Sequence, residues 1–116
     1  MHVLVMADTD SMRDAVTAHL ERSGMEVSAA PLGMGAVEHL DARHPGLVLL
    51  CVTGRHVELV ELCHALRRRA SAPILALLDD DTSGQIVRVL RAGADDVLLA
   101  PVSMDELLSL IHISEP

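Results

Sequence analysis

Residues 47–52 read Leu47-Val48-Leu49-Leu50-Cys51-Val52 and form the most apolar stretch of the 116-residue chain. Pro45 and Gly46 stand directly before this stretch. A short, continuously apolar run that follows turn residues is typical of a strand buried on both faces of a parallel sheet. We therefore expect this segment to form the central strand of the fold.

Shorter apolar runs lie on both sides of this segment and alternate with patterns of helical period. Strands are predicted over 3–6, 26–30, 73–78 and 96–99, and helices from residue 10 or 11 to Gly24, over 33–44, 57–70 and 83–92, and from Ser103 onward. Strands that alternate with helices indicate right-handed β-α-β crossovers. The predicted fold class is therefore α/β, with a doubly wound parallel sheet and helices on both faces.

The predicted helices carry signals for their ends and for their buried faces. Asp10 or Ser11 is expected to cap the first helix, and Ser103 with Glu106 fits the capping box of the last one. The apolar positions are Met12, Ala15, Val16 and Leu20 in the first helix, Leu59, Leu62, Cys63 and Leu66 in the third, and Ile86, Val87, Val89 and Leu90 in the fourth. We expect these faces to cover the sheet.

The composition excludes several classes of function. Half of the residues are hydrophobic, which is incompatible with a disordered chain, and the formal net charge of −8 argues against direct binding to a nucleic acid backbone. No apolar run approaches the roughly 20 residues that a membrane span needs, and the amino terminus lacks the pattern of a signal peptide. We therefore expect a cytoplasmic protein with no membrane partner, in which Cys51 and Cys63 are buried small apolar residues.

The last nine residues, 108–116, differ from the rest of the chain. They contain two of its four isoleucines, and they resemble the translation of a sequencing-library adapter. We therefore expect one domain over 1–107 and an adapter-derived tail over 108–116 that extends the fifth helix, with the natural protein continuing differently after Leu107. The alternative is a native last helix.

The expected sheet places one group of residues at a common edge. In doubly wound sheets, ligands and chemistry lie beyond the carboxyl ends of the strands. These positions are Ala7, Asp8, Cys51, Leu78 and Ala100.

Five segments, in order, resemble the receiver domain of response regulators, of the CheY-like superfamily and close to the OmpR type, over residues 2–107. They are residues 3–10 with Arg13, 45–50, 62–67, 72–77 and 92–101. The resemblance implies a five-stranded parallel sheet with the flavodoxin-like strand order 2-1-3-4-5. It also implies a place in two-component signal transduction.

The same resemblance implies a degenerate site. The family uses two adjacent acids and a phosphoacceptor aspartate to hold Mg²⁺, and a hydroxyl and a lysine to bind the phosphoryl group. At the matching positions this chain has Ala7 and Asp8, then Cys51, Leu78 and Ala100, and Val97 stands at the position of the switch aromatic. We therefore expect no catalytic residue, no Mg²⁺ or other cofactor, no enzymatic activity and no phosphorylation.

Individual side chains in this region leave alternatives open. Asp8 is a residual metal ligand or, as we favour, an acceptor for turn amides or a helix cap. Cys51 is a redox-active thiol or, as we favour, a buried neutral one. Asp79-Asp80-Asp81 supplies extra carboxylates for a metal or, as we favour, forms a solvated loop. The seven histidines show no zinc spacing.

The resemblance also implies partners. In receivers of the OmpR type the fourth helix, fifth strand and fifth helix form a homodimer face, for which Arg88, Arg91, Asp95 and Asp96 are the candidates here. We expect the regulatory and dimerisation domain of a transcription regulator, with a histidine kinase or other regulator upstream and DNA bound only through a missing carboxyl-terminal domain. The alternatives are a protein-binding scaffold in a phosphorelay, a small-molecule-sensing pseudo-receiver and, least favoured, an enzyme built on Cys51.

Overall fold

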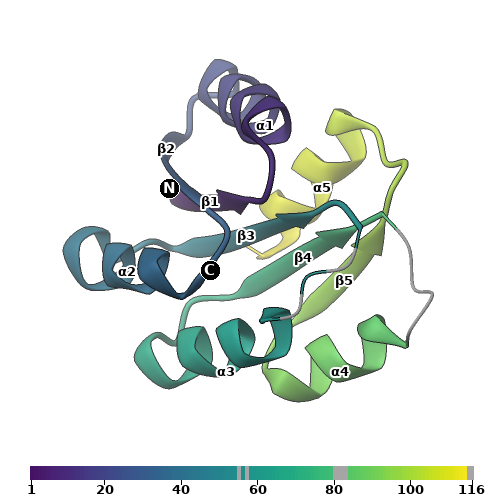
Figure 1. The fold of residues 1–116 in the computed structure, drawn as a ribbon. Coiled ribbons are helices and arrows are strands. Elements are labelled where there is room, and N and C mark those ends of the chain that lie inside the picture. Colours follow the sequence, from purple (N-terminus) through teal and green to yellow (C-terminus); the bar gives the residue numbers. More distant parts are fainter. Residues whose placement is uncertain (55, 57, 80–83, 115–116) are drawn as a thin grey trace.

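Five parallel strands form one sheet in the computed structural model, which describes residues 1–54, 56, 58–79 and 84–114. The strands are β1 (His2–Ala7), β2 (Glu26–Pro31), β3 (Leu47–Val52), β4 (Ile74–Leu78) and β5 (Asp96–Leu99). Their order in the sheet is β2-β1-β3-β4-β5 (Figure 1). The predicted fold class and strand order are confirmed.

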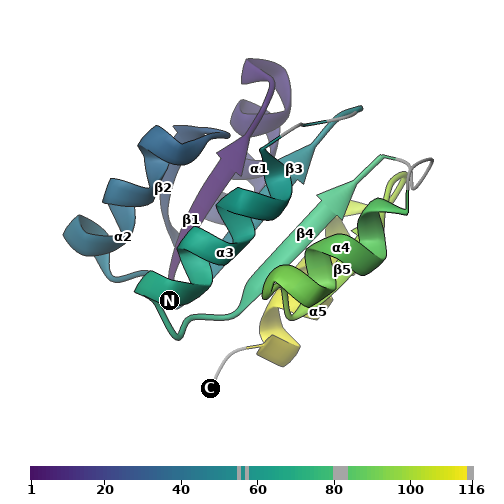
Figure 2. The ribbon, with the colours of Figure 1, turned by 60° about the horizontal axis from the view of Figure 1, so that its bottom comes forward.

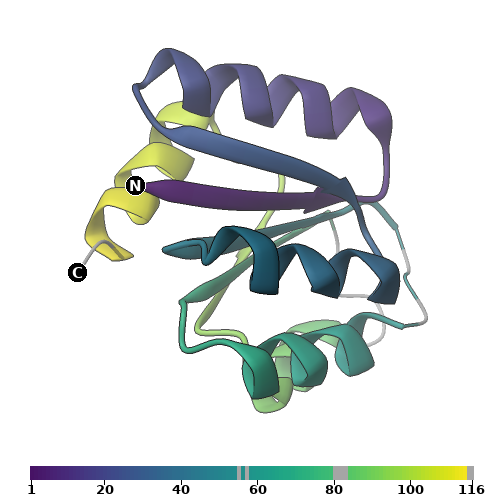
Figure 3. The same cartoon turned by 90° about the vertical axis from the view of Figure 1, so that its left-hand side faces the viewer.

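Helices cover both faces of the sheet. They are α1 (Asp10–Arg22), the 3-10 helix η1 (Met34–Val37), α2 (Glu38–Arg43), α3 (Leu59–Arg69), α4 (Gln85–Ala92) and α5 (Met104–Ser114). Helices α1 and α5 lie on one face, whereas α2, α3 and α4 lie on the other, where Figure 2 shows them in front of the sheet and Figure 3 shows both layers edge-on. None of the helices within the described ranges has the length and apolar character of a membrane span.

Strand β3 lies in the middle of the sheet because both of its faces are apolar. All six of its residues are buried. Leu47, Leu49 and Cys51 belong to the core cluster beneath α1 and α5, whereas Val48 and Leu50 belong to the cluster beneath α2, α3 and α4. Alternate residues of a strand point to opposite faces, so a strand covered on both sides is apolar throughout.

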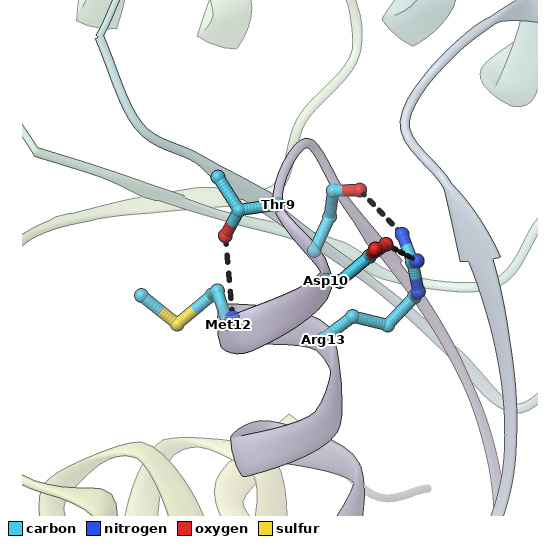
Figure 4. A network of polar contacts seen from close by, with 5 residues as sticks. Thr9, Asp10, Met12 and Arg13 are labelled. Carbon is cyan, nitrogen blue, oxygen red and sulfur yellow. Dashed lines mark hydrogen bonds and ion pairs between the residues drawn. The ribbon is translucent and has the colours of Figure 1, made fainter.

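The start of α1 corrects one prediction. The amino-terminal cap is Thr9, not Asp10 or Ser11: Thr9 has extended backbone angles, and its Oγ1 accepts a hydrogen bond from the Met12 amide at 3.2 Å (Figure 4). Asp10 is already helical, and its carboxylate pairs with Arg13. Capping requires an extended backbone immediately before the first helical residue, and Thr9 meets this requirement.

Two predicted apolar faces are only partly buried. Ala15 of α1 is exposed, while Val16 and Leu20 are fully buried. In α4, Val89 is buried, but Val87 and Leu90 remain 50% and 42% exposed. The predicted face of α3 is buried throughout.

The second predicted helix, over 33–44, is divided. The structure has the 3-10 turn η1 followed by the short α2, which ends at His44 in the left-handed region. Gly33 and Gly35 disfavour a regular α-helix at this point, because glycine has a low helix propensity. Helices α3 and α4 start later than predicted, at Leu59 and Gln85, and the predicted first residues Val57 and Ser83 lie outside the described residues.

Helix α5 continues past residue 107. The Ser103 hydroxyl accepts a hydrogen bond from the Glu106 amide at 3.1 Å, as a capping box requires. Leu107 and Ile111 are fully buried in the cluster shared with α1. The division of the chain after residue 107 stays a prediction.

Candidate functional site

The sheet brings the five predicted edge positions to neighbouring places. Ala7 and Cys51 are partners in the β1–β3 ladder. The amide of Asp8 donates to the Cys51 carbonyl at 3.3 Å, and the amide of Ala100 donates to the Leu78 carbonyl at 2.6 Å. All five residues therefore lie where the carboxyl ends of β1, β3, β4 and β5 meet.

The side chains at this edge are mostly withdrawn from solvent. Ala7 and Cys51 are fully buried in the cluster beneath α1 and α5, and Leu78 is buried in the opposite cluster. Ala100 is half-buried, and Asp8 is exposed. Asp8 is therefore the one charged group among these positions.

The thiol of Cys51 is held in its neutral, protonated form. Burial raises the pKa of Cys51 to about 12, and the nearby negative charge of Asp8 acts in the same direction. A thiol with this pKa stays protonated at neutral pH and is a poor nucleophile and metal ligand. The arrangement favours the interpretation of Cys51 as a buried neutral thiol.

Asp8 is engaged with the connection between β3 and α3. Its Oδ2 accepts a hydrogen bond from the Thr53 amide at 2.9 Å, and both of its carboxylate oxygens lie 3.1 Å from the Thr53 hydroxyl. We predicted an acceptor for turn amides or a helix cap: Asp8 does accept an amide, that of Thr53, 45 residues away in the sequence, whereas the helix cap is Thr9. The sequence analysis missed Thr53, whose signal was a hydroxyl residue directly after a buried strand.

Asp79, which directly follows β4, also binds the connection between β3 and α3. Its Oδ1 accepts a hydrogen bond from the Gly54 amide at 2.7 Å. Asp80 and Asp81 lie outside the described residues. The carboxylate of Asp79 is therefore used by the protein itself.

The donor set at the five positions does not suit Mg²⁺. This ion prefers six oxygen ligands in octahedral geometry, of which one or two are carboxylates. Ala7, Cys51, Leu78 and Ala100 offer no side-chain oxygen. Within the described ranges, no group of three or more His, Cys, Asp or Glu side chains is placed to hold a metal ion.

Arg13 strengthens the same edge from α1. Its guanidinium donates to the Ala7 carbonyl at 3.2 Å and pairs with Asp10 (Figure 4). The amide of Leu32 donates to that same carbonyl. Arg13 thus joins the start of α1 to the end of β1.

The predicted dimer face stays a prediction, and its residues lie on the surface of α4 and β5 and just before β5. Arg88, Arg91 and Asp96 are exposed. The carboxylate of Asp95 lies 2.9 Å from the Arg67 guanidinium and accepts a hydrogen bond from the Ile74 amide at 2.7 Å. Arg67, in the last turn of α3, is thereby paired within the chain.

The same surface carries apolar side chains that the charge pattern did not reveal. Val87 and Leu90 of α4 and Leu99 of β5 are between 42% and 50% exposed. Val97, at the position of the switch aromatic, is half-buried against the cluster beneath α4.

Comparison with known proteins identifies the family. Residues 3–112 match the family described as the response regulator receiver domain. The chain is 36% identical over 111 residues to the transcriptional regulatory protein CseB of Streptomyces avermitilis, covering 96% of this chain and 47% of that protein. It is 32% identical over 113 residues to the response regulator MprA of Mycobacterium leprae, covering 97% of this chain and 50% of that protein. The chain thus spans about half the length of these relatives.

Solved structures agree with this assignment. The BeF3-activated amino-terminal receiver domain of RstA from Klebsiella pneumoniae superimposes with a TM-score of 0.86 at 26% identity, covering 98% of this chain and 97% of that one. A two-component response regulator from Clostridium difficile gives a TM-score of 0.89 at 18% identity, over 98% of this chain and 94% of that one, and supports the fold alone. The chain belongs to the family of response regulator receiver domains.

Proposed function

We propose that this receiver domain works without phosphorylation, as the regulatory and dimerisation part of a DNA-binding transcription regulator. The observation that carries the proposal is Cys51 at the phosphoacceptor position, where burial raises the pKa of its thiol to about 12. A neutral, fully buried thiol cannot take the place of an aspartate that accepts a phosphoryl group.

The surroundings of Cys51 support the same conclusion. Phosphoryl transfer depends on cations that neutralise the charge developing on the phosphoryl oxygens. Ala100 stands where the family has its lysine, and Leu78 stands where it has its hydroxyl. With Asp8 as the remaining acid and no fitting site for Mg²⁺ or another cofactor, the domain is proposed to have no enzymatic activity.

The partners of the domain belong to the proposal. The surface of α4 and β5 combines the charges of Arg88, Arg91 and Asp96 with the exposed side chains of Leu90 and Leu99, and a mixed surface of this kind suits a second copy of the chain. The relative CseB is named a transcriptional regulatory protein and is about twice as long as the matched region. We propose that a DNA-binding domain outside this chain gives the output in the cytoplasm.

A small-molecule sensor is less well supported. Such a function requires an open cavity at the edge of the sheet, whereas Ala7, Cys51 and Leu78 are buried. If the chain is instead a stand-alone scaffold in a phosphorelay, we expect the same lack of phosphorylation at the edge of the sheet. It differs in having no effector domain.

Incubation with acetyl phosphate and Mg²⁺, followed by intact-mass measurement, tests the proposal. The chain should remain unmodified, while a phosphorylatable receiver domain treated in parallel gains one phosphoryl group. A stoichiometric, base-labile phosphoryl group on this chain would overturn the proposal.

A further inference from the structure

The first two residues after β3 are held from both neighbouring strands. Asp8 directly follows β1, and Asp79 directly follows β4. Strands β1 and β4 flank β3 in the sheet. Thr53 and Gly54, which open the connection from β3 to α3, therefore lie between two carboxylates.

Each carboxylate accepts hydrogen bonds from this connection. Asp8 accepts the amide of Thr53 at 2.9 Å and its hydroxyl at 3.1 Å. Asp79 accepts the amide of Gly54 at 2.7 Å. Hydrogen bonds to an ionised acceptor are shorter and stronger than neutral ones, and these distances fall in that range for the two amides.

These contacts are tertiary cross-links and not local turns. The Asp8–Thr53 bonds join residues 45 apart in sequence, and the Asp79–Gly54 bond joins residues 25 apart. The β1–β3 ladder ends at the pair Ala7–Cys51, and the Asp8 amide adds one backbone hydrogen bond beyond it, to the Cys51 carbonyl. The side-chain bonds of Asp8 and Asp79 continue this cross-linking to Thr53 and Gly54. Three strand ends are thereby tied together by the protein's own groups.

We infer that Asp8, Thr53, Gly54 and Asp79 form a built-in loop clamp that holds the start of the β3–α3 connection in one position without a bound cation or phosphoryl group. The inference rests on the proposed function, in which the domain acts without either ligand. In the loop clamp both carboxylate oxygens of Asp8 and Oδ1 of Asp79 face N–H and O–H donors of the connection. The loop clamp therefore holds Thr53 and Gly54 in one conformation that does not depend on phosphorylation or on a bound cation.

Amide hydrogen exchange, followed residue by residue by NMR on the full chain, tests the loop clamp. In Asp8→Ala, exchange of the Thr53 amide should accelerate by roughly tenfold or more, because its charge-assisted bond is lost. In Asp79→Ala, the Gly54 amide should accelerate by a similar factor. Thr53→Val removes the hydroxyl donor but keeps the amide, so a smaller acceleration is expected.

Asp10→Ala is the matched control. Asp10 is an exposed carboxylate at the same edge, but it pairs with Arg13 and not with the loop. This variant should leave both amides unchanged. Adding Mg²⁺ to the unmodified chain should likewise leave the exchange rates and chemical shifts of Thr53 and Gly54 unchanged.

Two results would overturn the loop clamp: equal exchange in the unmodified chain and in both Ala variants, or the same acceleration in Asp10→Ala. If Asp8→Ala does not fold, Asp8→Asn keeps an oxygen acceptor and removes the charge, and a smaller acceleration at Thr53 supports the loop clamp. Phosphorylation of the unmodified chain would refute the proposed function, but it would not contradict the exchange rates measured on the unphosphorylated chain and its variants. The two proposals can therefore fail separately.

Discussion

The position of Cys51 shows how burial decides the chemistry of a single residue. The thiol lies at the edge of the sheet where the family performs its chemistry, yet it is fully enclosed by the core. Its neighbour Asp8 adds negative charge, which opposes formation of a thiolate. Burial and the charge of Asp8 therefore both favour the neutral thiol over the reactive thiolate at this position.

The two buried thiols make stability depend on pH in a defined interval. Burial raises the pKa of Cys51 to about 12 and, despite the opposing charge of Arg67, that of Cys63 to about 11, from an ordinary value of 9.0. The unfolded chain loses these protons at lower pH than the folded chain. Stability is thus fully present below pH 9.0 and falls as the pH rises toward the folded-state values.

The free energy of unfolding should fall in this interval by about 1.4 kcal/mol per pH unit for each thiol. The chain has no Lys or Tyr, so no other side chain with an ordinary pKa titrates there. Urea unfolding between pH 9 and pH 11 measures the slope, and Cys51→Ala should reduce it. An unchanged slope in that variant would contradict the assigned burial.

Among the glycines, Gly93 has the least room for an added side chain. Its φ is +127°, and an added Cβ would lie 2.8 Å from Cβ of Arg67. Gly93→Ala should therefore lower the free energy of unfolding by about 1–3 kcal/mol. Gly35→Ala is the control, because Gly35 has open space around it and should change stability by less than about 1 kcal/mol. Urea unfolding at pH 7 compares the two, and an equal effect would contradict the close approach of Gly93 to Arg67.

At the scale of the elements, helix ends differ in how well local sequence predicts them. The Ser103 cap of α5 was read correctly, since its Glu106 partner identifies it. The cap of α1 was misassigned, because Thr9, Asp10 and Ser11 are all good capping residues. The choice among them depends on where β1 ends and the backbone turns.

Thr9→Ala should lower the free energy of unfolding by about 1 kcal/mol, because the Met12 amide loses its acceptor. Ser11→Ala should change it by less than about 0.5 kcal/mol, since Ser11 is an exposed helical residue. Thermal or urea unfolding of the two variants provides the measurement. The reverse order of effects would restore the original assignment of the cap.

At the scale of the whole molecule, we propose that assembly uses the surface formed by α4 and β5. Asp95 is held by Arg67 within the chain, so it contributes less to a dimer face than predicted. The exposed residues of α5 include Ser109 and His112, and the sequence of this helix contains no Arg or Lys. The apolar side chains of Val87, Leu90 and Leu99 remain available for contact.

Sedimentation velocity should therefore show a mostly monomeric chain at micromolar concentration. Ser109→Arg with His112→Arg should strengthen dimerisation in a salt-sensitive way, because surface charges are screened over about 10 Å at 0.1 M salt. Adding Asp96→Ala to that variant should remove the gain. A tight dimer of the unmodified chain would place the interface elsewhere.

The sequence by itself determined the α/β class and the strands, and it predicts an altered site. The strands could be read because a strand covered on both faces must be apolar throughout, as in β3. The prediction of an altered site rests on the resemblance of the segments around Asp8, Cys51 and Ala100 to the family. The split of η1 from α2 and the extent of the exposed face of α4 were not readable from local patterns.

The tertiary structure alone decided what the polar groups do. Asp8 meets Thr53, Asp79 meets Gly54 and Asp95 meets Arg67 across separations of 45, 25 and 28 residues. No local pattern encodes such pairs, because the packing of whole strands and helices sets which side chains come within hydrogen-bond distance. The same reason explains why the pKa of Cys51 depends on the enclosing core and not on its neighbours in sequence.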